Sequence, residues 1–147
     1  MTILRSLHTF TVLLCATSVC LAQPAEKTLV KSFNVQGSHA IELGVRGDVH
    51  VQPWTNEALR IQMTVTLPAG TPAMLKSLVE SGRYNLKSTL IDNVLHISLP
   101  NMEREVLFKG KAVEETLSFI VYAPEKVTVQ LGEGASTNKE GVVANSF

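Results

Sequence analysis

The chain has little cysteine, and all of it lies near the amino terminus. The two cysteines among the 147 residues are Cys15 and Cys20. The remainder of the chain, from residue 21 onward, carries no thiol. This excludes a disulfide framework, a cysteine nucleophile and a thiolate metal site from that remainder.

Basic and acidic side chains are balanced, and aromatic side chains are scarce. The sequence has 13 Lys and Arg against 13 Asp and Glu, and Phe, Trp and Tyr make up 5% of it. Nucleic-acid binders and polybasic membrane ligands carry an excess of basic residues. The composition therefore indicates neither a nucleic-acid partner nor a polybasic membrane patch.

Long apolar runs are also missing, except for one at the amino terminus. That run extends from Phe10 to Leu21 behind a single basic residue, Arg5, and the small residues Cys20 and Ala22 stand at signal-peptidase spacing. It is shorter than the roughly 18 apolar residues that a membrane-spanning helix needs. The pattern predicts a secretory signal peptide over residues 1–22, cut before Gln23.

This signal has consequences for compartment and domain organisation. We expect an exported protein that resides in the periplasm, at the cell surface or outside the cell, with no transmembrane segment in the processed chain. The processed chain, from Gln23 onward, has a length that suits one domain with one core.

Strict alternation of apolar and polar residues marks much of the remaining chain. In residues 58–67, "ALRIQMTVTL", one parity is wholly apolar: Leu59, Ile61, Met63, Val65 and Leu67. A period of two is typical of a strand with one solvent-exposed face. The same pattern predicts strands near 39–45, 48–52, 94–99 and 127–131. In "TLSFIVYAP", residues 116–124, nearly every position is apolar, which predicts a strand covered on both faces.

Turn and helix signals complete the expected elements. The segment "TPAMLKSLVESG" predicts one short helix near 72–81, with Thr71 as N-cap and Gly82 as its stop. Asp92-Asn93 predicts a hairpin turn between two strands. The charged segment 101–115 is expected to be a long connection with a short strand around Val106 and Phe108.

Together these signals predict an all-β fold with one helix. We expect short strands stacked in sandwich-like or solenoid-like sheets, forming a single domain over residues 23–131. Residues 132–147 are small and polar, which predicts a flexible tail or a truncated repeat.

The order of these pieces resembles the putative adhesin domains of exported bacterial envelope proteins, including the auto-transporter adhesin head domains. The resemblance rests on "KSFNVQGSHAIELGVRGDVHVQPWTNEALRIQMTV", then "DNVLHISLP", then "LSFIVYAPEKVTVQLGEGA", from about Lys31 to Ala135. It implies an all-β fold in the cell envelope and no catalytic residues. Family members usually continue through many more short strands after the equivalent of Leu131.

The tripeptide Arg46-Gly47-Asp48 matches a cell-attachment signal. A glycine supplies positive φ, and an aspartate side chain can bond the neighbouring backbone, so Gly-Asp also makes a good turn between strands. We favour the turn. Arg46 and Asp48 remain candidates for surface binding.

His50 and Trp54 are the other candidate surface residues. Asp48 and His50 share one face of a strand, where a carboxylate beside an imidazole can orient a base or a metal ligand. The sequence has no second histidine or acid at metal-ligand spacing, so we expect solvent-facing histidines and no metal or cofactor. Trp54 could stack on a sugar, but as the only tryptophan we expect it to cap the core.

Catalytic signatures are missing from the sequence. There is no Gly-x-Ser-x-Gly and no phosphate-binding glycine loop, and the adjacent Glu114 and Glu115 point to opposite faces of a strand. We expect a non-enzymatic, adhesin-like binding module that meets a macromolecule or glycan at the cell envelope. The alternative is a periplasmic carrier or sensor accessory that holds a small apolar ligand between its sheets.

Overall fold

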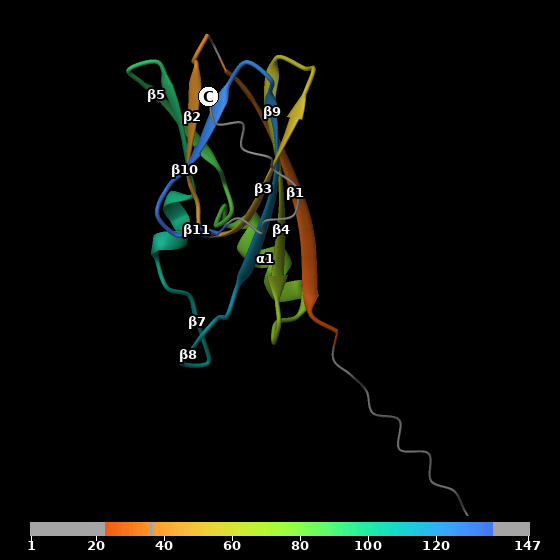
Figure 1. Ribbon diagram of the computed structural model, residues 1–147. Coiled ribbons are helices and arrows are strands. Elements are labelled where there is room, and N and C mark those ends of the chain that lie inside the picture. Colours follow the sequence, from red (N-terminus) through yellow and green to blue (C-terminus); the bar gives the residue numbers. More distant parts are fainter. Residues whose placement is uncertain (1–22, 36, 137–147) are drawn as a thin grey trace, which may run out of the picture.

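The computed structural model describes residues 23–35 and 37–136, and this part of the chain is all-β apart from two short helices (Figure 1). The predicted signal peptide, residues 1–22, and residues 137–147 of the predicted tail lie outside the described residues. Within the described ranges, no helix is both long enough and apolar enough to cross a membrane.

Two sheets pack face to face, and a small hairpin lies apart from them (Figure 1). The five-stranded sheet has the order β1 (Ala25–Asn34), β4 (Ala58–Leu67), β9 (Thr116–Pro124), β3 (Gly47–Trp54) and β11 (Ala135–Ser136). The four-stranded sheet has the order β10 (Thr128–Leu131), β2 (Ala40–Gly44), β6 (Val94–Ser98) and β5 (Lys87–Ile91). The hairpin consists of β7 (Leu107–Phe108) and β8 (Lys111–Ala112).

Three strand pairs repeat one path between the sheets. We call each pair a rung: β2 then β3, β6 then β9, and β10 then β11. Neighbouring rungs pair in parallel in both sheets, so that Ile41 lies between Leu95 and Val129. The antiparallel strands β1, β4 and β5 extend the two sheets. The fold is therefore all-β, as the sequence predicted, and it joins in one domain the two arrangements that were expected as alternatives, a sandwich and a short solenoid-like stack.

The core lies between the two sheets. The alternating side chains of β4 expected to face inward, Leu59, Ile61, Met63, Val65 and Leu67, are at most 1% exposed. They meet buried residues of both sheets in one hydrophobic cluster. The predicted parity of this strand is confirmed, and so are the other predicted strands.

β9 departs from the expectation that both its faces are covered. Its inward side chains are buried, but Ile120 and Tyr122 on the other face are only partly buried. Ile120 lies between His50 of β3 and Gln62 of β4 on that outer face. Since both neighbours are polar, the outer face does not form a second core.

The ten-residue edge strand β1 was not predicted from its alternation. It pairs along its whole length with β4, but only Ala25 and Phe33 are buried. Lys31 has the inward parity, yet its Nζ donates to the Leu86 backbone oxygen at 2.7 Å. Lysines at such positions protect a sheet edge from pairing with other chains, and they hide the period of two.

The helix and the hairpin turn form as predicted. α1 (Pro72–Glu80) begins at Thr71, whose side chain accepts a hydrogen bond from the Met74 amide at 3.2 Å. Gly82 follows the helix with a φ of 77°. Asp92 and Asn93 have φ values of 49° and 61°, as the two central residues of a type I′ turn between β5 and β6 require.

Candidate binding site

The Arg46-Gly47-Asp48 tripeptide forms the corner at which the chain passes from β2 to β3. Gly47 has a φ of 126°, and its amide donates to the Gly134 oxygen at 3.2 Å. A Cβ at Gly47 would lie 2.3 Å from the Leu117 backbone oxygen, so only glycine fits. The predicted positive φ at Gly47 is confirmed.

An open cleft of about 600 Å³ lies beside this corner, at the end of the sandwich that carries the 3-10 helix η1 (Pro100–Glu103). Its walls come from residues 44–48, from Ser98, Leu99, Pro100, Met102 and Glu103, from Glu115, Thr116 and Leu117, and from Glu133. Each of the three rungs thus contributes its link between the sheets. The stacking of the rungs is what gathers these distant segments into one site.

Charged side chains converge on the cleft from all three links. Arg46 comes from the first, Glu103 from the second and Glu133 from the third. Asp48 stands at the start of β3, and its Oδ1 accepts a hydrogen bond from Ser136 Oγ at 2.6 Å. The partner of Asp48 is thus a side chain of the third rung, whereas the sequence suggested neighbouring backbone.

The other two candidate residues lie away from this cleft. His50 and Trp54 share the outward parity of β3, opposite to the buried Val49. The strand from Asp48 to Trp54 spans about 20 Å, because each residue of a strand adds roughly 3.3 Å. The four candidates predicted from the sequence therefore do not form one site.

Trp54 does not belong to the core cluster, and the expectation that it caps the core is wrong. Its ring lies 5.5 Å from that of Tyr122 on the outer face of the five-stranded sheet, where Tyr122 also faces Arg60. The Trp54 Nε1 donates to the Ala58 oxygen at 2.9 Å. The ring contact with Tyr122 and the hydrogen bond to Ala58 together fix the indole at the turn between β3 and β4.

The described histidines do not gather with acidic residues into a metal site. Among residues 23–35 and 37–136, no group of three or more His, Cys, Asp and Glu side chains is placed to hold a metal ion. His96 instead lies on the outer face of the four-stranded sheet, with its Nδ1 3.1 Å from Glu42 Oε2.

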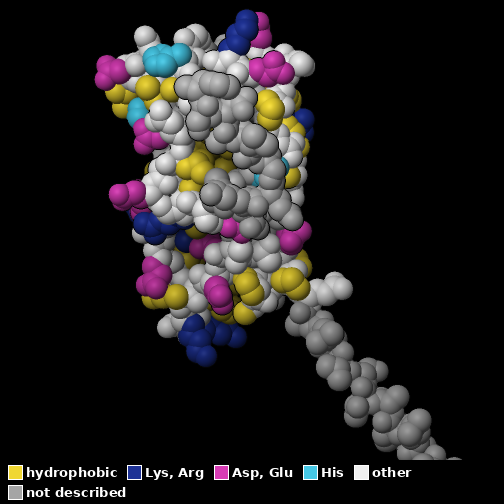
Figure 2. Space-filling model, viewed as in Figure 1, with side chains coloured by type: hydrophobic (Ala, Val, Ile, Leu, Met, Phe, Trp, Pro, Cys, Tyr) yellow, Lys and Arg dark blue, Asp and Glu magenta, His cyan; other side chains and the backbone are white. Residues whose placement is uncertain are grey.

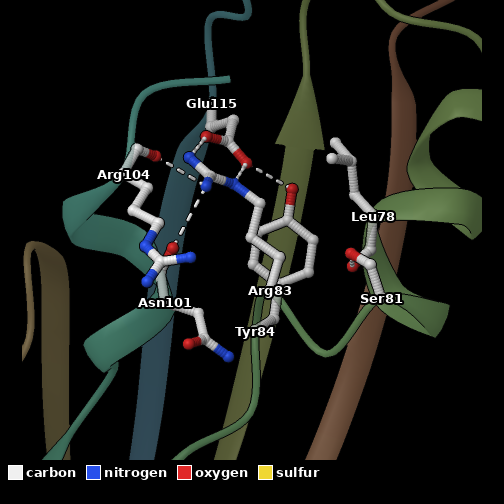
Figure 3. Close-up of polar contacts among 7 residues, drawn as sticks. All are labelled: Leu78, Ser81, Arg83, Tyr84, Asn101, Arg104 and Glu115. Atoms are coloured by element: carbon white, nitrogen blue, oxygen red, sulfur yellow. Dashed lines mark hydrogen bonds and ion pairs between the residues drawn. The ribbon is translucent and has the colours of Figure 1, made fainter.

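A buried ion pair adjoins the cleft, whose lining includes one of its members, Glu115 (Figure 3). Arg83, just after α1, pairs with Glu115 through Nε at 2.7 Å and Nη2 at 2.5 Å, and the two side chains are 8% and 6% exposed. The Arg83 Nη1 also donates to the backbone oxygens of Asn101 and Arg104. Tyr84 donates its hydroxyl to Glu115. One guanidinium thus joins both ends of the β6 to β9 link.

The ionisation of this group follows from its contacts. Burial alone would raise the pKa of Glu115, but hydrogen bonds from Arg83 and Tyr84 and the guanidinium charge outweigh it and lower that pKa. Burial, followed by the hydrogen bond to Glu115, raises the pKa of Tyr84. The hydrogen bond to Glu115 likewise raises the pKa of Arg83. Each charged group has a hydrogen-bond partner of opposite charge. We call Arg83, Tyr84 and Glu115 the clamp and infer that its role is structural.

Sequence reasoning missed Glu103 and Glu133 as cleft residues and missed the clamp altogether. Glu133 lies between Gly132 and Gly134, and an acid flanked by glycines is a usable turn signal. The Arg83 to Glu115 contact joins distant parts of the sequence and carries no local signal.

No protein-family model matches the chain, and no curated protein matches it. Among solved structures, a "putative adhesin" from Bacteroides fragilis is 14% identical with a TM-score of 0.42, over 76% of this chain and 42% of its own. A "putative cell adhesion protein" from Clostridium sporogenes is 14% identical with a TM-score of 0.40, over 78% and 48%. A "putative adhesin" from Parabacteroides merdae is 18% identical with a TM-score of 0.36, over 76% and 39%. The chain spans less than half the length of each.

Proposed function

We propose that this chain is a non-enzymatic, exported protein of the cell envelope or cell surface that acts as an adhesin-like binding module. One observation carries the proposal: the links of all three rungs meet around one open cleft that presents Arg46, Asp48, Glu103 and Glu133. A site assembled from several strand ends on a rigid scaffold is typical of ligand recognition.

The chemistry of the cleft favours a hydroxyl-rich or amide-rich ligand. Arg46 offers fixed donors, and the carboxylates of Asp48, Glu103 and Glu133 offer acceptors. Apart from Glu115, which Arg83 neutralises, the cleft has three acids against one base, and this excess of negative charge disfavours phosphate and sulfate groups. We therefore propose that the cleft binds a neutral or basic segment of a glycan or of another macromolecule at the envelope.

The interior of the sandwich favours this module over a carrier of small apolar ligands. A carrier needs an apolar cavity between its sheets. Here Leu43, Ile61 and Val121 are at most 1% exposed and belong to one hydrophobic cluster that both sheets share.

Arrays of glycans and of envelope peptides test the proposal. We expect the protein to retain a defined ligand, and the variant Arg46→Ala/Asp48→Asn to bind it at least tenfold more weakly, because each lost hydrogen bond to a charged group weakens binding about tenfold. The ligand should be recovered chemically unchanged.

A matched control comes from the exposed ion pair of α1. Lys76 and Glu80 are 72% and 66% exposed and do not line the cleft. The variant Lys76→Ala/Glu80→Gln should bind like the wild type. Equal binding by the cleft variant, or turnover of the ligand, would contradict the proposal.

A further inference from the structure

The β6 to β9 link is much longer than the fold requires. The same passage between the sheets takes only residues 45–46 in the first rung and residues 132–134 in the third. In the second rung, β6 then β9, it takes residues 99–115. Most of this connection therefore serves a purpose other than joining two strands, and loops of such length in small domains are usually functional.

The extra length projects the β7–β8 hairpin from the lower end of the molecule (Figure 1). Lys109 and Gly110, with φ values of 51° and 76°, form its two-residue turn. Leu107 and Phe108 are 61% and 55% exposed, the two highest values among the exposed large apolar residues. Neither side chain contributes to the core.

Each face of the hairpin carries one exposed large apolar side chain, Leu107 beside Ala112 on one and Phe108 beside Lys111 on the other. Because successive residues of a strand point to opposite sides, Leu107 and Phe108 expose apolar surface in opposite directions. A flat protein surface would cover one of these faces only, whereas a lipid layer would surround both.

The charges near the tip are basic. Lys109 and Lys111 follow the apolar pair on either side of Gly110, and no acid occurs from Val106 to Val113. The Lys109 Nζ lies 5.4 Å from the Phe108 ring centroid. Figure 2 shows basic side chains at the lower tip of the molecule, with hydrophobic and acidic side chains side by side just above them.

The base of the hairpin is fixed to the sandwich. Arg83 binds Asn101 and Arg104 on one side of the connection and Glu115 on the other (Figure 3). The Asn101 Nδ2 donates to the Gly82 oxygen at 2.9 Å, and the Val113 amide donates to the Val106 oxygen at 2.9 Å. Because the base is fixed, the tip of the hairpin points in one direction. This favours a role in which the tip inserts into a partner over that of a flexible connecting loop.

We propose that the β7–β8 hairpin docks this protein on a lipid bilayer that contains anionic lipids. Leu107 and Phe108 enter the boundary between headgroups and acyl chains, and Lys109 and Lys111 bind the headgroup phosphates. This docking surface is separate from the cleft and does not depend on the function proposed for it.

Sedimentation with lipid vesicles tests the docking. The protein is used in the form that expressing cells export, with its amino terminus checked by mass spectrometry, because a retained residue 10–21 run would itself bind lipid. Vesicles of phosphatidylcholine with phosphatidylglycerol should bind the wild type, and Leu107→Ser/Phe108→Ser should bind at least tenfold more weakly.

Two further variants define the cause. Lys109→Gln/Lys111→Gln should weaken binding to the mixed vesicles by about fivefold per lysine and leave the weaker binding to pure phosphatidylcholine unchanged. Leu90→Ser/Ile91→Ser, on the exposed β5 edge, is the matched apolar control, since these side chains are 45% and 51% exposed. It should bind like the wild type.

Phe108→Trp reports insertion directly, because Trp54 is the only tryptophan of the native chain. Its added emission should shift to the blue on mixed vesicles. Undiminished binding by Leu107→Ser/Phe108→Ser, or equal loss in the β5 control, would overturn the proposal. Self-association that this hairpin variant abolishes would overturn it as well, by assigning the surface to a second copy. Arg46→Ala/Asp48→Asn should leave vesicle binding unchanged, which separates the two proposals.

Discussion

Arg83 shows how much of the fold can depend on one side chain. It leaves the end of α1 and joins Glu115, before β9, to the backbone of Asn101 and Arg104. All buried side-chain nitrogen and oxygen atoms in the described residues have hydrogen-bond partners. Removing one member of such a group leaves the others buried without a partner, which costs more than the group contributes when intact.

The substitution Arg83→Met should lower the free energy of unfolding by about 3 to 5 kcal/mol, because it leaves the Glu115 carboxylate buried and unpaired. The double variant Arg83→Met/Glu115→Met should recover most of that loss, since no buried charge remains. Urea denaturation measures both. A double variant as unstable as the single one would show that the unpaired charge is not the cause.

The same group predicts how stability depends on pH. The pKa of Glu115 lies below its usual 4.5 in the folded chain, so the unfolded chain binds the proton more tightly. Its contribution is present above pH 4.5 and is lost as pH falls through the folded pKa. The pKa of Tyr84 is raised from 10.0, so its contribution is present below pH 10 and is lost as pH rises beyond that.

Denaturation at a series of pH values measures this dependence. Between pH 4.5 and the lowered pKa of Glu115, the wild type should lose stability more steeply than Arg83→Met/Glu115→Met. Parallel curves for the two proteins would place the acid sensitivity elsewhere.

Residue-level prediction succeeded where the signal was local. The inward parity of β4 follows from its alternating residues and is reproduced by their burial. The prediction for Trp54 was wrong because it relied on the general tendency of a lone tryptophan to be buried. Trp54 has the same strand parity as Asp48 and His50, and this parity indicates the outer face. The clamp depends on a connection whose path no local pattern specifies.

At the scale of elements, corners and turns decide how strands meet. Gly47 packs its backbone against Leu117 in the neighbouring rung, whereas Gly110 stands in the open turn of the β7–β8 hairpin. Both glycines have positive φ. What differs between them is the space available for a side chain.

The substitution Gly47→Ala should therefore destabilise the protein far more than Gly110→Ala. A Cβ at Gly110 meets no atom within 4 Å, so only the conformational cost of about 1 kcal/mol remains. At Gly47 the clash with the Leu117 oxygen adds to that cost and forces the rungs apart. Thermal unfolding of the two variants makes the comparison, and similar melting temperatures would contradict the corner geometry.

Element prediction failed for β1 and succeeded for α1, and both outcomes have physical reasons. α1 has a capping threonine, a proline in its first turn and a glycine after it. In β1 the inward parity includes Lys27 and Lys31, because an edge strand can direct lysines to solvent from either face. A test for alternation alone passes over such a strand.

At the scale of the molecule, the three rungs share one core but no sequence period. Ile41, Leu95 and Val129 occupy equivalent positions in adjacent strands, although their separations along the chain are unequal. The echo between "VHVQP" and "VTVQL" is misleading, because Val51 and Val129 belong to different sheets. The links between the sheets also differ widely in length: one comprises residues 45–46 and another residues 99–115. The solenoid-like stack therefore becomes visible only once the strands are paired.

Because both sheets share this core, Ile61→Asp should abolish folding of the whole described domain. It would bury an unpaired carboxylate at a side chain that is 1% exposed, which costs several kcal/mol of a total stability of about 5 to 15 kcal/mol. Gln62→Asp, on the outer face of the same strand, should fold normally. Circular dichroism and thermal melting distinguish them, and a cooperative melt for Ile61→Asp would refute the shared core.

Hydrogen exchange on the protein with its array-identified ligand tests most directly whether the rungs build a binding cleft. We predict that binding slows exchange in three segments distant in sequence, residues 44–48, 98–103 and 132–136, and leaves α1 unchanged. Protection confined to the outer face around Trp54 and Tyr122, with those three segments unaffected, would show that the rungs do not build the binding site.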